Sequence, residues 1–101
     1  MALPRNRQTD ELFDSILQLK DREECYKYFE DLCTVKEIHS FAQRLEVAKL
    51  LDRGCSYQNT TELTGVSPAT IGRVNRCLTY GTGGYKMMLE RLGENMDDNK
   101  A

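Results

Sequence analysis

The sequence predicts an all-α protein of about six helices that includes a helix-turn-helix. Three observations predict this fold class. Apolar residues recur at helical spacing along most of the chain, capping signals precede several of these stretches, and no strand pattern or internal repeat is present. The most informative stretch is residues 57–78, whose pattern is typical of a helix, a tight turn and a second helix.

Two helices are predicted in the first third of the chain. Residues 12–19 carry apolar side chains at helical spacing, and Thr9 or Asp10 is the expected N-terminal cap. Asp21 and Glu24, three residues apart, have the spacing of a capping box and should open the second helix.

The longest predicted helix covers about residues 35–52. Thr34 and Glu37 form another capping box at its start, and Gly54 is the expected left-handed terminator. Its apolar residues spread around more than one face. Such a helix is either central in the fold or shared between subunits.

The helix-turn-helix is predicted at residues 57–78. Gly65 stands where the turn needs a left-handed backbone, Val66 should fill the angle between the helices, and Ser67 and Pro68 suit the start of the second helix. Thr60 and the threonine after it are weak helix formers, so the first helix is expected to be loosely held.

The second helix of this motif has an apolar face and a polar face. Ile71, Val74 and Leu78 should pack inward, which leaves small, hydroxyl and arginine side chains available for a major groove and its phosphates. The simpler alternative is a plain helical hairpin. The residues predicted to contact DNA are Gln58, Asn59, Ser67, Ala69, Thr70, Arg73 and Arg76.

The final part of the chain predicts a link and one more helix. Residues 80–85 are rich in glycine, but they lack the preceding strand and the Lys-Ser/Thr ending of a phosphate loop. Residues 85–92 should form an amphipathic helix closed by Gly93. We therefore expect a mobile arm at 1–8, one domain at 9–93 and a disordered tail at 94–101.

Composition bounds the function. The 101 residues carry 40% hydrophobic and 30% charged residues, without a membrane-length apolar run or an apolar signal region, so a cytoplasmic protein with no membrane partner is expected. The four cysteines form no Cys-x-x-Cys pair, and the one histidine has no spaced partner. We therefore predict reduced thiols, no metal site and no cofactor. The absence of a recognisable nucleophile-base pair argues against an enzyme.

The charge distribution leaves room for DNA binding. The net charge is −2, which argues against a uniformly basic nucleic-acid binder. Between residues 54 and 88, however, Arg73, Arg76 and Lys86 are opposed only by Glu62. A locally positive face on an acidic body should bind double-stranded DNA with modest affinity and should depend on two copies.

The chain resembles the tryptophan repressor family over residues 34–92, and within it the branch often labelled YerC/YecD. Residues 83–92, GGYKMMLERL, match the ending of that branch. The other residues that carry the resemblance are Thr34, Glu37, Gln43, Arg44, Leu45, Leu51, Arg53, Gly54, Ala69, Thr70, Ile71 and Arg73.

The resemblance implies an all-helical, intertwined homodimer whose recognition helices lie about 34 Å apart, the spacing of successive major grooves. It also implies an effector pocket. Arg44 and Arg73 match two arginines that flank tryptophan in the family's repressor, and Thr34 matches a residue that the partner chain supplies near the ligand amine. Val74 replaces a glycine and Cys77 replaces a serine. The larger valine should exclude the indole ring.

The sequence thus predicts a dimeric, sequence-specific DNA-binding transcriptional regulator, repressor-like and not responsive to tryptophan. The favoured interpretation of Arg44 and Arg73 is a pair of surface or phosphate-facing arginines, and the alternative is a site for another small effector. A second alternative is a protein-interaction module that does not bind DNA, which the net acidity permits.

Overall fold

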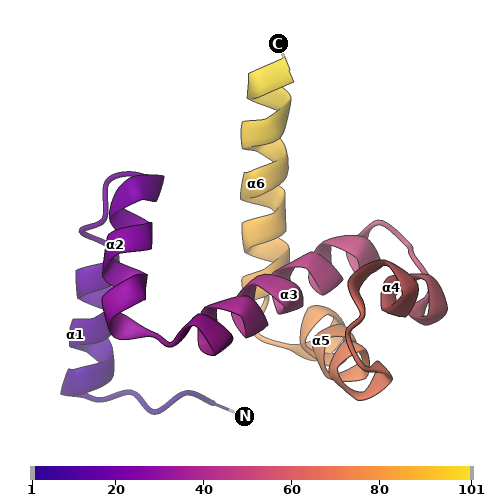
Figure 1. Ribbon diagram of the computed structural model, residues 1–101, viewed down its shortest axis with the longest axis horizontal. Helices are drawn as coiled ribbons and strands as arrows, with labels where there is room; N and C mark the ends of the chain where they lie inside the picture. The colour runs from indigo at the N-terminus through magenta and orange to yellow at the C-terminus, as the bar shows by residue number, and fades with distance from the viewer. Residues whose placement is uncertain (1, 101) are drawn as a thin grey trace. The chain divides into compact units, whose positions relative to one another are not determined.

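The protein forms six α-helices, and no strand occurs in the part of the chain that the structure describes (Figure 1). The structure is a computed structural model that describes the backbone of residues 2–100 and the side chains of residues 2–93. The predicted all-α class with a helix-turn-helix is confirmed. The helices are α1 (Arg7–Ile16), α2 (Arg22–Leu32), α3 (Val35–Asp52), α4 (Tyr57–Thr64), α5 (Pro68–Tyr80) and α6 (Gly84–Lys100).

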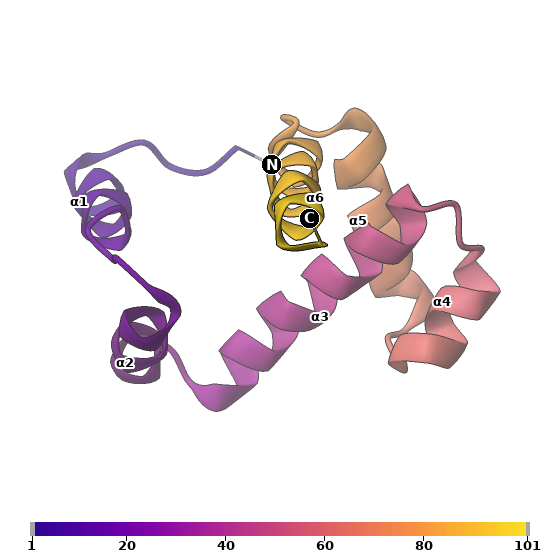
Figure 2. The same ribbon diagram turned by 90° about the horizontal axis from the view of Figure 1, so that it is seen from above.

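The chain divides into two compact units, Met1–Ile38 and His39–Ala101, with the boundary inside α3. In the first unit, α1 and α2 lie side by side (Figures 1 and 2). The hydroxyl groups of Ser15 and Tyr28 lie 2.6 Å apart and join the two helices by a hydrogen bond. This unit has no fully buried side chain on either helix, so it holds little core of its own.

The caps of the first two helices are set by short polar side chains. Asn6, rather than the predicted Thr9 or Asp10, caps α1, because its side-chain oxygen accepts a hydrogen bond from the Thr9 N–H at 2.9 Å. The helix therefore begins at Arg7, inside the segment predicted to be an arm. Asp21 caps α2 as predicted, accepting from the Glu24 N–H at 2.8 Å.

The capping box of α3 is confirmed in both directions. The Glu37 N–H donates to Thr34 Oγ1 at 3.1 Å, and the Thr34 N–H donates to the Glu37 carboxylate at 2.9 Å. These bonds hold the pKa of Glu37 below its ordinary value, chiefly through the Thr34 backbone N–H. The bounds of α3 agree with the sequence-based prediction.

The second unit has a small apolar core at the junction of α3, α4 and α5. Val47 and Ala48 of α3, Val66 of the turn, and Ile71 and Val74 of α5 form it, each less than a tenth exposed. Helix α5 packs against both α4 and α6 (Figure 2). Because α5 packs against two neighbouring helices, these contacts determine which of its faces stays exposed within this unit.

Thr60, expected to loosen α4, is instead its fully buried residue. Its hydroxyl donates to the Ser56 carbonyl at 2.8 Å, so burial leaves no hydrogen-bonding group unsatisfied. The Thr64 hydroxyl then donates to the Thr60 carbonyl at 2.7 Å. Both hydroxyls bond to carbonyls one helical turn earlier. That α4 is loosely held stays a prediction.

The link before α6 is shaped by a close backbone approach. Gly81 ends α5, and a Cβ at this position would run into the Cys77 carbonyl group. The last helix does not close at Gly93 as predicted, since α6 continues to Lys100 and Gly93 has no left-handed backbone. The predicted domain boundaries remain predictions.

Candidate nucleic-acid interface and adjoining pocket

The turn between α4 and α5 is built as the sequence predicts. Gly65 has φ 72° and ψ 5°, a left-handed conformation that a Cβ would strain, and its N–H donates to the Thr61 carbonyl. Ser67 caps α5 by accepting from the Thr70 N–H at 3.3 Å, and Pro68 occupies the first turn. The turn and the cap thereby fix the orientation in which α5 begins relative to α4.

The predicted DNA-contacting residues lie on α4, α5 and the turn between them. All are exposed except Thr70, which is half-buried and shares a 3.1 Å hydrogen bond with the Ser67 hydroxyl. Ile71, Val74 and Leu78 occupy the opposite, buried face of α5, as predicted. The exposed members are Gln58, Asn59, Ser67, Ala69, Arg73 and Arg76.

A cavity of about 240 Å³ lies within the second unit, beside α5. Helix α3 provides two of its lining residues, α5 provides four, and the first turn of α6 provides one. The lining residues are Ser40, Arg44, Thr70, Arg73, Val74, Cys77 and Tyr85. The cavity therefore brings together side chains that are up to 45 residues apart in sequence (85 − 40).

Arg44 is held by contacts with its own helix. Its Nη2 donates to Ser40 Oγ at 3.1 Å, and its guanidinium carbon lies 5.5 Å from the centroid of the Phe41 ring. Neither Arg44 nor Arg73 forms an ion pair with a described side chain, and no carboxylate lines the cavity. The cavity consequently has an uncompensated positive charge.

Tyr85 places a phenol in this positive environment. Burial raises the pKa of Tyr85 above its ordinary value and outweighs the opposing effect of the Arg44 and Arg73 charges. The Cys77 thiol adds to the upward shift. The phenol is therefore protonated at neutral pH and can donate a hydrogen bond into the cavity.

Four of the five residues predicted for an effector pocket come together: Arg44, Arg73, Val74 and Cys77. The fifth, Thr34, lies in the other unit, where its hydroxyl and N–H belong to the α3 capping box. In a single chain it does not line this cavity, and its supply by the partner chain stays a prediction.

Sequence reasoning missed Ser40 and Tyr85, and it assigned Thr70 to DNA alone. Ser40 had a signal, because it precedes Arg44 by one helical turn and so lies on the same face of α3. No local signal identified Tyr85, because only the packing of α6 against α5 brings it to the cavity that Arg44 also lines. Its apolar spacing with Leu89 instead identified the face that packs on the core.

Neither a metal centre nor a membrane span is found in the part of the chain that the structure describes. No group of three or more His, Cys, Asp or Glu side chains there could hold a metal ion, and the four cysteines are free. No described helix is long and apolar enough to cross a membrane.

Known proteins match most of this chain. YerC of Bacillus subtilis (strain 168), an uncharacterised protein, is 56% identical over 90 residues that cover 89% of this chain and 86% of YerC. Two crystal structures each superpose with a TM-score of 0.85 at 50% identity over 88% of this chain. One is a candidate Trp repressor from Staphylococcus aureus, covered to 89%, and the other is a TrpR-like protein from Eubacterium eligens ATCC 27750, covered to 92%.

The family assignment follows from these matches. The family profile described as Trp repressor protein matches residues 7–93, which include all six helices' starting points and every residue of the cavity. The family is one of DNA-binding regulators and not of enzymes. The resemblance predicted from the sequence is confirmed: this chain belongs to the Trp repressor family.

Proposed function

We propose that this protein is a cytoplasmic, sequence-specific transcriptional regulator that binds double-stranded DNA as a homodimer and does not respond to tryptophan. The observation that carries the proposal is the exposed face of α5. Ala69, Arg73 and Arg76 lie on that face, while the buried face anchors the helix to α4 and α6. An anchored helix that presents a small side chain and two guanidinium groups suits a major groove.

The roles of the individual residues follow from their chemistry. Ala69 and Thr70, in the first turn of α5, are short enough for the helix to approach base edges closely. Arg73 and Arg76, further along, reach phosphates, which position the protein without reading sequence. Gln58, Asn59 and Ser67 flank this surface and should add contacts to the DNA backbone or to base edges.

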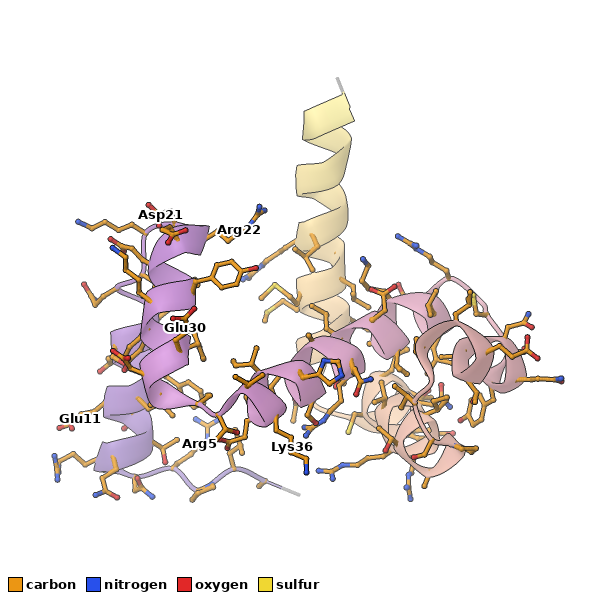
Figure 3. The ribbon with its side chains drawn as sticks, viewed as in Figure 1. Arg5, Glu11, Asp21, Arg22, Glu30 and Lys36 are labelled. Atoms are coloured by element: carbon orange, nitrogen blue, oxygen red, sulfur yellow. The ribbon has the colours of Figure 1, made fainter. Side chains whose placement is uncertain are left out.

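A homodimer is supported by apolar surface that one chain leaves uncovered. Val35, Leu17 and Phe41 are 89%, 78% and 48% exposed. In the first unit, a groove of about 830 Å³ is lined by apolar and aromatic side chains of α2 and the start of α3, including Phe29 and Ile38. Arg22 and Glu30, which Figure 3 labels on α2, also line it.

The groove gathers several apolar side chains on one surface, and contiguous exposed apolar patches usually mark an interface. A second copy of the chain is the occupant that the family resemblance implies. Two copies would also supply two recognition helices, which a protein with only two exposed arginines on α5 needs for useful affinity.

Selection of bound oligonucleotides from a random pool, followed by anisotropy on the selected and a scrambled duplex, tests the DNA function. If each protomer holds phosphates with Arg73 and Arg76, four phosphates are neutralised. The slope of log K against log salt should then be about −3.6. No enrichment, or binding that does not depend on salt, would favour the protein-interaction alternative.

Sedimentation velocity at micromolar concentration tests the dimer separately. We expect a single species of twice the chain mass. On dilution, the dimer should dissociate only together with unfolding, so that no folded monomer is seen. A stable, folded monomer would contradict the intertwined arrangement without affecting the DNA experiment.

A further inference from the structure

We propose that Gly72 of α5 determines sequence specificity, because its missing side chain leaves space beside the Ala69 methyl group for the C5-methyl group of a thymine in the major groove. The inference rests on the proposed function and deepens it, since it names the base that this part of the recognition helix selects.

Gly72 is unfavourable where it stands, and nothing within the chain requires it. It lies inside α5, where glycine destabilises a helix relative to alanine. Its φ lies outside the left-handed region, so the backbone does not need a glycine. A Cβ at this position would have no atom within 4 Å, so the packing of the chain does not need one either. Among the uses of glycine, this leaves the close approach of a bound molecule to the backbone.

The place of Gly72 on α5 puts this open space beside the predicted DNA contacts. Residues three and four apart are neighbours on a helix, so Gly72 lies next to Ala69 on one side and Arg76 on the other. Both neighbours are exposed, whereas Gly72 itself is half-buried. A duplex that contacts Ala69 and Arg76 would therefore also come close to the backbone at Gly72.

The chemistry of this surface selects what can fill it. The N–H and C=O groups of a residue inside a helix are used in intrahelical hydrogen bonds, so Gly72 presents only its Cα hydrogens. The Ala69 side chain presents only a methyl group. Neither can read the donors and acceptors of base edges. The apolar group on these edges is the C5-methyl of thymine, which alanine side chains contact in major grooves.

Deoxyuridine tests the assignment, because it is thymidine without the C5-methyl group. Each thymine of the oligonucleotide selected from a random pool is replaced in turn, in both half-sites, and the affinity is measured by anisotropy. For the unmodified protein, one of these replacements should weaken binding about fourfold per half-site, the effect of one buried methyl-sized group.

Gly72→Ala moves a methyl group from the DNA to the protein. It should weaken binding to the thymine site about fivefold or more per half-site, because the new Cβ overpacks the contact. The deoxyuridine replacement that weakened the unmodified protein should instead strengthen binding by the variant. This reversed preference is a coupling between two groups in contact, which independent effects at separate places would not produce.

Gly93→Ala is the matched control. Gly93 also lies inside a helix, α6, without a left-handed φ and with open space for a Cβ, but it is not part of α5. Denaturant melts should show both variants to be at least as stable as the unmodified protein, and Gly93→Ala should keep its DNA affinity and its thymine preference. A loss confined to Gly72→Ala would then not come from misfolding.

The possible failures are distinguishable. Unchanged affinity or an unchanged thymine preference in Gly72→Ala would overturn the inference, as would an equal loss on scrambled duplexes. Dissociation of the Gly72→Ala dimer in sedimentation would assign the open space to the partner chain and overturn it as well. A selected site at which no deoxyuridine matters would overturn the inference and leave the regulator standing. Failure to select any sequence would refute the proposed function, and the inference with it.

Discussion

Val74 should decide whether this protein can bind tryptophan. The side chain is 2% exposed, belongs to the core with Val47 and Ile71, and also lines the cavity beside Arg73. An indole ring could enter only by displacing it, and overpacking costs about 1–3 kcal/mol, or tenfold to over a hundredfold in affinity. We therefore expect no measurable tryptophan binding by the unmodified protein and a clear gain in Val74→Gly.

The gain in Val74→Gly should come with a loss of stability. Truncating a buried aliphatic side chain costs about 2 kcal/mol or more, and glycine inside a helix costs about 1 kcal/mol relative to alanine. We expect a total of about 3 kcal/mol in the free energy of unfolding. Val74→Ala should lose less unfolding free energy and should still open part of the same side of the cavity. It therefore serves as the test if the glycine variant folds poorly.

Calorimetry with L-tryptophan and thermal unfolding are the two assays. Val47→Ala is the matched control, because Val47 is equally buried in the same core but does not line the cavity. It should be destabilised without gaining tryptophan affinity. Tight tryptophan binding by the unmodified protein, coupled to stronger DNA binding, would falsify the reasoning. Equal, weak binding by all variants would show that Val74 is not the obstacle.

Three further predictions concern α5 and the α3 cap. Thr70→Ala should cost about 1–3 kcal/mol on the selected DNA site and little on a scrambled one, whereas Arg76→Ala should weaken both alike in anisotropy titrations. Gly72→Ala should raise the unfolding free energy by about 0.4–1 kcal/mol in denaturant melts, since Gly72 lies inside α5 with φ outside the left-handed region and open space for a Cβ. The pKa of Glu37, followed by NMR, should lie below 4.5 and move upward in Thr34→Ala, because a hydroxyl that stabilises the carboxylate is lost. Since the folded pKa is lowered, the stability that Glu37 contributes is present above its unfolded pKa and is lost as pH falls through the folded value.

Local signals explain what the sequence predicted well. The caps at Asp21, Thr34 and Ser67 each depend on a side chain and a backbone N–H three residues later, so spacing alone identifies them. The cap of the first helix was predicted at Thr9 or Asp10, and Asn6 was placed in the arm, although asparagine is also a common cap. Asn6 is the cap because the helix begins at Arg7, and its side-chain oxygen also accepts from the Thr9 hydroxyl at 3.1 Å.

Tertiary packing explains what the sequence could not predict. Helix propensity marked Thr60 as a weak helix former, but no local pattern indicated that it would be fully buried with its hydroxyl bonded to the Ser56 carbonyl. Tyr85 reaches the cavity only because α6 packs on α5, and no local pattern records that contact. Residues assigned through the family resemblance, Arg44 and Arg73, came together because the resemblance already encodes tertiary structure.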